Sequence, residues 1–158
     1  MKARDPKLIE VLNEVLTGEL AAINQYFLHA KLCKNWGFER LHAYLRMESI
    51  GEMRHAEAVM DRILYLEGIP NVQRMNKLNI GETVEEQLAS DLAMEVDAID
   101  RLTKGIALAT AVGDHGTRDL LEKILVAEEE HVDWIETQQT AIQQIGLQNW
   151  LAQQVHPA

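Results

Sequence analysis

Six glutamate and histidine residues interrupt the apolar stripes of the predicted helices. Carboxylate and imidazole side chains at such buried positions are suited to binding metal ions. Glu19, for example, lies between Val15 and Ile23 at four-residue spacing. Spacing of three or four residues places such a side chain on the buried side of a helix. A buried carboxylate is costly unless it is protonated, paired or bound to a metal. The full set is Glu19, Glu52, His55, Glu95, Glu128 and His131.

The six residues repeat between the two halves of the chain. Glu19 and Glu95, Glu52 and Glu128, and His55 and His131 are each 76 positions apart. Each half therefore offers one Glu and then Glu-x-x-His on the next helix, the arrangement of di-iron carboxylate bundles. No lysine or arginine interrupts the stripes nearby, whereas two divalent cations would balance four carboxylates. The mixed oxygen and imidazole ligands suit iron or manganese, and zinc could also bind.

A third Glu-x-x-His sequence, Glu39 to His42, serves as a control. Positions 76 residues further on hold His115 and Arg118, so this pair has no counterpart in the second half. We predict that it lies on the surface. A competing interpretation of the six residues is a buried network of Glu–His hydrogen bonds without metal.

Helical periodicity along the chain predicts an all-α fold. A first helix is expected from Asp5-Pro6, an N-cap residue with proline in the first turn, to about residues 35–37. A second is expected over 39–66, followed by a long connection over 67–81 that contains proline and two glycines. Helices two and three therefore need not be antiparallel neighbours.

The second half of the chain predicts two more long helices and a short one. Thr83 and Glu86 form a capping-box pattern that starts the third helix. A short turn over 113–116 precedes the fourth, and Gly146 ends it before a tail that can form a small fifth helix. Two hairpins joined by a long crossover describe the ferritin-like four-helix bundle.

Composition narrows the remaining classes of function. A length of 158 residues suits a single domain over 1–158. The formal charge of −10 disfavours nucleic acid as a partner, and no apolar run has membrane-spanning length. The first residues, MKARDPKLIE, lack the apolar stretch of a secretory signal, so we expect a cytoplasmic protein. One cysteine, Cys33, excludes a Cys-rich metal site.

Long segments of the chain resemble bacterioferritins. They include LTGELAAINQYFLHAKL, ESIGEMRHAE, LEGIPN, LNIGETVEEQLASDLAMEVDAI and EEEHVDWIETQ, which contain all six candidate ligands. The resemblance implies a homo-oligomeric shell of 24 subunits built from dimers, with ferroxidase sites in each bundle and ferric mineral inside. It also implies haem b between paired subunits, with Met53 as axial ligand, and a bacterioferritin-associated ferredoxin as electron donor. Leu20, Ile23 and Phe27 are candidate walls for the porphyrin.

The expected function is iron storage with ferroxidase activity. Glu52 and Glu128 would bridge two irons, with Glu19 and His55 on one iron and Glu95 and His131 on the other. Oxygen or hydrogen peroxide would accept the electrons. Two departures from the family pattern, Met47 and Gly51, make an additional iron site on the inner surface doubtful. Arg46 replaces a tyrosine that related chains often carry, so mineral growth or electron flow could differ.

Three other functions remain open. A rubrerythrin-like peroxidase shares the bundle but usually carries a Cys-rich iron domain, which this sequence lacks. A DNA-protecting mini-ferritin places its metals between subunits, whereas this chain holds two complete ligand sets. A structural or haem-carrying bundle would lack rapid iron oxidation.

Overall fold

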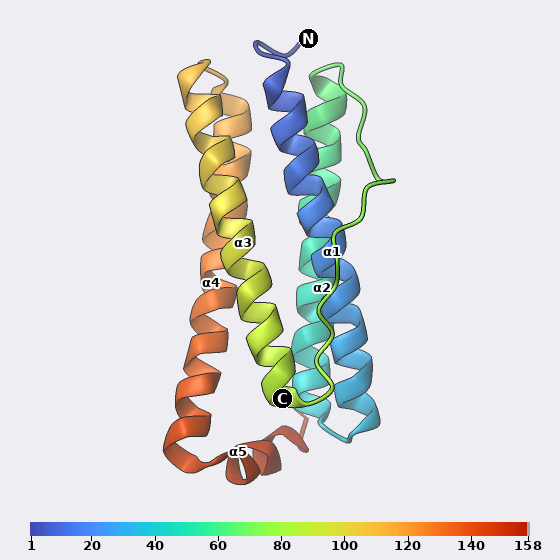
Figure 1. Cartoon of the computed structure of the whole chain (residues 1–158), viewed down its shortest axis with the longest axis vertical. Coiled ribbons are helices and arrows are strands. Elements are labelled where there is room, and N and C mark those ends of the chain that lie inside the picture. Colours follow the sequence, from blue (N-terminus) through green and yellow to red (C-terminus); the bar gives the residue numbers. More distant parts are fainter. Residues whose placement is uncertain (158) are drawn as a thin grey trace.

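The computed structural model describes residues 1–157 as five α-helices. They are α1 (Lys7–Asn35), α2 (Glu39–Tyr65), α3 (Val84–Ala111), α4 (His115–Ile145) and α5 (Leu147–Gln154). The first four run along the long axis of the molecule, and α5 lies across one end of the bundle (Figure 1). No strand occurs among residues 1–157, so the predicted all-α fold is confirmed. None of the described helices combines the length and apolar character needed to cross a membrane.

The crossover between α2 and α3 determines the topology. It starts where α2 ends and runs the length of α1 to the opposite end of the bundle, where α3 begins (Figure 1). Helices α2 and α3 therefore run in the same direction, and the pairs α1–α2 and α3–α4 form two hairpins. The Asn13 side chain anchors the upper crossover, because its amide donates to Ile69 O at 3.2 Å and its oxygen accepts from Asn71 N at 2.7 Å.

The helix ends follow the local sequence signals. Gly37 adopts φ +86° in the turn between α1 and α2, a conformation that glycine accepts without strain. Thr83 Oγ1 accepts a hydrogen bond from Glu86 N at 3.2 Å, as the capping-box pattern predicts. The reciprocal bond to the Glu86 carboxylate comes from Glu82 N at 2.8 Å.

Two helix starts differ from the prediction. Helix α1 begins at Lys7 with Pro6 as its N-cap, while Asp5 Oδ1 accepts from Lys7 N at 2.9 Å. Helix α4 begins at His115, so Gly116 lies inside the helix and not in the turn. Asp114 is the reason, because its carboxylate caps the helix by accepting from Thr117 N at 3.0 Å.

The interior consists of two apolar clusters separated by a polar layer. One cluster includes Leu16, Val59 and Leu121, and the other includes Tyr26, Leu45 and Ile135. Each long helix passes from one cluster to the other, and the six candidate ligands lie at these transitions. The polar layer therefore crosses the middle of the bundle.

Candidate metal centre

The structure brings all six candidate ligands together in the interior. Helix α1 provides Glu19, α2 provides Glu52 and His55, α3 provides Glu95, and α4 provides Glu128 and His131. They form two groups that could each hold a metal ion, and the potential ligand atoms within a group lie within 4.8 Å of one another. Both groups include Glu52 and Glu128.

The first group surrounds the Nδ1 atom of His55. This nitrogen lies 3.0 Å from Glu52 Oε2, 3.4 Å from Glu19 Oε2 and 3.5 Å from Glu128 Oε1. Its imidazole is therefore oriented toward three carboxylates from three different helices. Such convergence on one ring nitrogen is the geometry expected of a metal ligand.

The second group surrounds the Nδ1 atom of His131. This nitrogen lies 3.1 Å from Glu95 Oε1, 3.1 Å from Glu128 Oε2 and 3.3 Å from Glu52 Oε1. Glu52 and Glu128 thus each direct one oxygen toward each histidine. A carboxylate that faces two positions in this way can bridge two metal ions.

Several carboxylate oxygens in this layer are buried without a hydrogen-bond partner. They are Glu19 Oε2, Glu52 Oε1 and Glu128 Oε2 among the described residues. The ion pairs of the cluster involve only histidine and no lysine or arginine within residues 1–157. Unsatisfied buried oxygen atoms are costly in a protein interior. Metal ions fit these residues, because they would supply the missing partners.

The electrostatics of the cluster keep protons on several of its groups. Burial and the charges of Glu52 and Glu128 raise the pKa of Glu19 well above its ordinary value. Burial and the charges of Glu128 and Glu52 raise the pKa of Glu95 to about 8. Burial alone would lower the pKa of His55, but hydrogen bonds to Glu128, Glu19 and Glu52 raise it to about 12. Without metal, protons therefore provide the positive charge that the cluster needs.

Glu52 behaves differently from the other glutamates. Burial raises its pKa, yet hydrogen bonds from His131 and His55 lower it to about 2. It therefore remains ionised between the two imidazoles. A carboxylate held as an anion at the centre of the cluster suits a bridging ligand.

Two side chains outside the set of six candidate ligands contact the cluster. Glu48, buried on α2 one turn before Glu52, accepts a hydrogen bond from Nε2 of His131. The Tyr26 hydroxyl donates to Glu95 Oε1, and burial and the charge of Glu95 raise the Tyr26 pKa. The four-residue spacing between Glu48 and Glu52 is the feature of the sequence that could have placed Glu48 on the same face of the helix as the ligands. Metal-binding histidines commonly donate their second ring nitrogen to such a carboxylate.

The control pair lies apart from this centre. Glu39 is exposed, and His42 is partly buried with its Nδ1 2.9 Å from the carbonyl oxygen of Ala30. Met47, on the same helix, is 58 % exposed. Among the described residues, neither set of side chains that could hold a metal ion includes Glu39, His42 or Met47.

The candidate haem ligand lies on the outer side of α2. Met53 is 56 % exposed and points away from the carboxylates, as its position next to Glu52 predicts. It lines a mostly apolar cavity of about 280 Å³. Ile23 and Phe27 line the same cavity. Leu20 does not line it and packs against the apolar cluster that includes Leu16, Val59 and Leu121.

A second buried polar network was not predicted from the sequence. His29 Nδ1 lies 2.9 Å from Asp91 Oδ1, and both side chains are almost fully buried. Gln25 donates to the same Asp91 oxygen at 2.8 Å. His29 Nε2 accepts from the backbone N–H of Gly81 at 3.0 Å, which joins α1 and α3 to the end of the crossover.

Comparison with known proteins agrees with this geometry. The family model for the ferritin-like domain matches residues 9–145. The chain is 50 % identical over 149 residues to bacterioferritin from Mycobacterium leprae and to bacterioferritin BfrA from Mycobacterium tuberculosis, covering 94 % of each chain. It is 49 % identical over 142 residues to bacterioferritin from Streptomyces coelicolor, covering 90 % of this chain and 85 % of the relative. By fold, ligand cluster and sequence, the chain belongs to the bacterioferritin family of ferritin-like proteins.

Proposed function

We propose that this protein stores iron and oxidises Fe(II) to Fe(III) in the buried cluster. The observation that carries this proposal is the pair of overlapping ligand groups that share Glu52 and Glu128. Membership of the bacterioferritin family supports iron storage as the wider role.

In the proposed reaction, two Fe(II) ions are the substrates. Glu19 and His55 bind one ion, Glu95 and His131 bind the other, and Glu52 and Glu128 bridge them. Each Fe(II) loses one electron, and oxygen or hydrogen peroxide accepts the two electrons. Four carboxylates match the charge of two divalent ions, and the buried layer holds both ions in fixed positions.

The protein groups also control the protons of this reaction. His55 and Glu95 hold protons before the metal arrives, as their raised pKa values indicate. Fe(II) binding displaces these protons because ligands bind metal in the deprotonated form. The water-poor site then stabilises Fe(III) through four carboxylate charges.

The storage part of the proposal requires a hollow assembly. We propose a homo-oligomer of 24 subunits built from dimers, with ferric mineral in the cavity, because the relatives named above are bacterioferritins. Exposed apolar side chains on the crossover and on the outer face of α1, including Ile69, Met75 and Phe27, suit contacts between subunits. A ferredoxin that delivers electrons for iron release is part of the same proposal.

Haem b is proposed at the dimer interface, with Met53 as one axial ligand and the same residue of a second copy as the other. The open apolar cavity beside Met53 fits one half of such a site. Bound haem would supply a one-electron carrier at the surface of the bundle. Ile23 and Phe27 would contact its ring.

An anaerobic Fe(II) titration of the metal-free protein tests the ferroxidase proposal, followed by mixing with oxygen in a stopped-flow instrument. We expect saturation at two ions per chain and rapid oxidation that Glu52→Ala abolishes. Glu57→Ala, an exposed change on the same helix, should leave both properties unchanged. Absence of stoichiometric binding would reduce the cluster to a structural Glu–His network. Rapid oxidation in an assembled His55→Ala protein would contradict the ligand assignment.

A further inference from the structure

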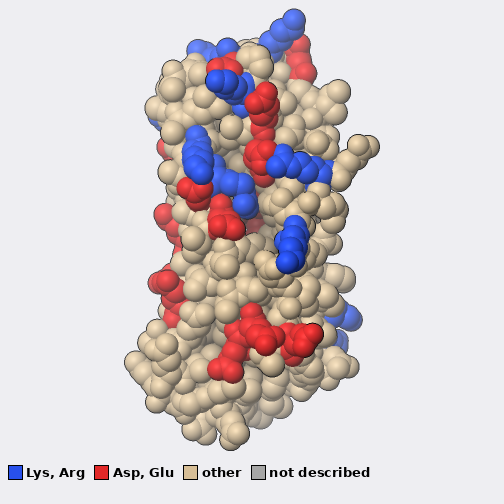
Figure 2. All heavy atoms as spheres, in the orientation of Figure 1, with Lys and Arg blue, Asp and Glu red and all other residues tan. Residues whose placement is uncertain are grey.

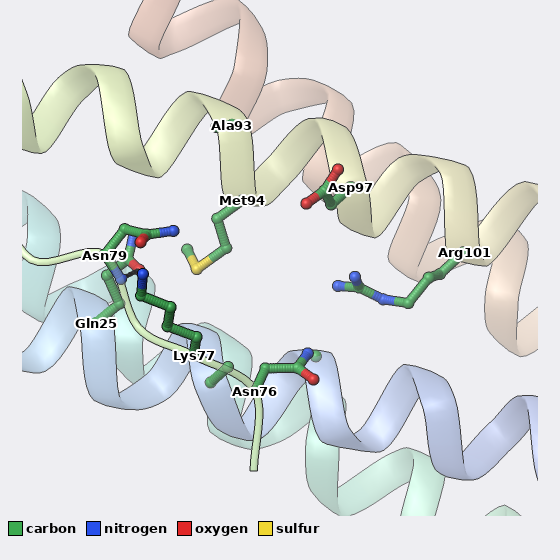
Figure 3. A pocket seen from close by; sticks show the side chains of 10 residues that line it. Gln25, Asn76, Lys77, Asn79, Ala93, Met94, Asp97 and Arg101 are labelled. Carbon is green, nitrogen blue, oxygen red and sulfur yellow. Dashed lines mark hydrogen bonds between the residues drawn. The ribbon is translucent and has the colours of Figure 1, made fainter.

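A separate polar pocket lies between α1, α3 and the crossover. It encloses about 320 Å³. Figure 3 shows side chains from all three segments directed into it. The polar and charged residues that line it are Gln25, Asn76, Lys77, Asn79, Asp97 and Arg101. None of them belongs to the carboxylate–histidine cluster.

Arg101 lies at one end of this pocket. Its side chain extends from α3 toward the pocket interior (Figure 3). The guanidinium lies against Gly18 of α1, where an added Cβ would come within 2.3 Å of an Arg101 nitrogen. Glycine inside a helix costs about 1 kcal/mol relative to alanine. Space for the Arg101 guanidinium is a physical reason for glycine at this buried position.

The charged groups of the pocket have no partners within residues 1–157. Arg101, Lys77 and Asp97 form no ion pair or side-chain hydrogen bond, whereas Lys104 pairs with Asp100 on the same helix. Two cations and one carboxylate leave the pocket with a net positive charge in a chain of charge −10. Figure 2 shows basic side chains of the upper half of the displayed face interspersed with acidic ones, and a group of acidic side chains nearer its lower end. A small anion is the ligand class that this charge favours.

We propose that this pocket binds inorganic phosphate. The planar guanidinium of Arg101 can donate two parallel hydrogen bonds to an oxyanion, and the Asn76 amide provides a further donor beside it (Figure 3). Lys77 adds positive charge from the other end of the pocket. Asp97, an exposed residue one helical turn before Arg101, lines the same pocket and can accept a hydrogen bond from a ligand bound there.

Asp97 makes the pocket selective among oxyanions. Phosphate retains at least one proton near neutral pH and can donate its P–OH group to the Asp97 carboxylate. Sulfate retains none, so its oxygen atoms would face the Asp97 carboxylate as an unpaired like charge. Phosphate should therefore bind more tightly than sulfate.

Isothermal titration calorimetry of the metal-free assembly with phosphate and with sulfate tests the site. Metal-free protein is necessary because ferric mineral itself binds phosphate. We expect Arg101→Gln to weaken phosphate binding about tenfold to a hundredfold, the effect of losing charge-assisted hydrogen bonds. Lys104→Gln is the matched control, since it removes one positive charge from the same helix outside the pocket. Equal affinities for these two variants would overturn the proposal.

Two further variants keep the test decisive. Gly18→Ala leaves every charge in place but displaces the Arg101 guanidinium, so phosphate affinity should fall although circular dichroism shows a folded helical protein. Asp97→Asn should remove the preference for phosphate over sulfate, whereas Asp100→Asn should retain it. Wild-type binding in Gly18→Ala, or equal affinity of the unmodified protein for both anions, would refute the assigned geometry. None of these variants changes a residue of the carboxylate–histidine cluster. Failure of the proposed ferroxidase function would therefore leave the phosphate-binding results unchanged.

Discussion

Glu48 accepts a hydrogen bond from Nε2 of His131, on the side of the imidazole ring opposite to Glu95 and Glu128. This contact leaves Nδ1 as the nitrogen that faces the carboxylate cluster. The orientation and tautomer of His131 therefore depend on a residue that does not itself reach the proposed metal positions.

Replacement of Glu48 by alanine should weaken metal binding at the second position about tenfold to a hundredfold, because His131 loses the acceptor that orients it. Competition titration with Co(II), which is not oxidised during the measurement, can resolve the two positions. Glu48→Gln retains an acceptor oxygen and should recover part of the affinity. The exposed Glu57→Ala serves as control. Unchanged affinity in Glu48→Ala would mean that packing alone orients His131.

Metal binding should release protons. The pKa of His55 is raised to about 12 and that of Glu95 to about 8, so both groups hold protons at pH 7 without metal. Divalent ions require the deprotonated groups, and binding should therefore strengthen as the pH rises. We expect release of about two protons or more per chain on saturation. Calorimetry in buffers with different ionisation enthalpies measures this number, and a value of zero would contradict the assigned protonation.

Met53→Leu should abolish haem binding without affecting Fe(II) oxidation. The side chain is exposed beside an apolar cavity and lies away from the carboxylates, so a leucine of similar volume preserves packing while removing the thioether. Absorption spectra after reconstitution with haem provide the measurement. Met47→Leu, another exposed methionine on α2, is the control and should bind haem normally.

His29→Leu should destabilise the bundle by about 3 kcal/mol, because it leaves the buried Asp91 carboxylate short of a partner and the Gly81 N–H without an acceptor. Urea denaturation at a fixed protein concentration measures the loss. Trypsin cleavage in the crossover, at exposed Arg74 or Lys77, should become faster. His115→Leu changes an exposed histidine and should alter neither quantity.

Asp114 provides a prediction of how stability depends on pH. Burial raises its pKa, but hydrogen bonds from Thr117 and the charge of Arg62 outweigh this and lower the pKa below its ordinary value of 3.8. A depressed carboxyl pKa stabilises the fold above the ordinary pKa, and this contribution is lost as the pH falls through the folded value. Asp114→Ala should therefore cost about 1–2 kcal/mol at pH 7 and progressively less below pH 3.8.

Asp114→Asn separates the two contributions of this residue. Asparagine is also a good N-cap, so the variant keeps the bond to the start of α4 and loses only the charge opposite Arg62. Its stability at pH 7 should lie between those of the wild type and Asp114→Ala. Thermal unfolding at several pH values provides the comparison.

The sequence was sufficient to predict the helices and the residues that meet at the bundle centre. Apolar stripes with a period of 3.6 residues define the buried face of each helix, and a glutamate in such a stripe must then lie in the interior. The 76-residue repeat identified which glutamates of the first half have a counterpart in the second half. Glu48 breaks that repeat, because the position 76 residues further on is Ile124, so its place beside His131 required the structure.

Other features depend on how the helices pack and could not be derived from local patterns. His29 and Asp91 lie on different helices, 62 positions apart, and no helical spacing relates them. The contact of Arg101 with Gly18 likewise joins α3 to α1. The start of α4 was misplaced because two glycines suggested a longer turn, although Asp114 was already an adequate cap.

The two shared carboxylates, Glu52 and Glu128, belong to opposite hairpins, and each faces the histidine of the other. Bound metal would therefore connect the halves of the molecule across their interface, as a removable cross-link. Loading would raise the temperature at which the hairpins separate, and chelation would lower it again. We therefore expect the folded bundle to be less stable when iron is scarce than when iron is plentiful.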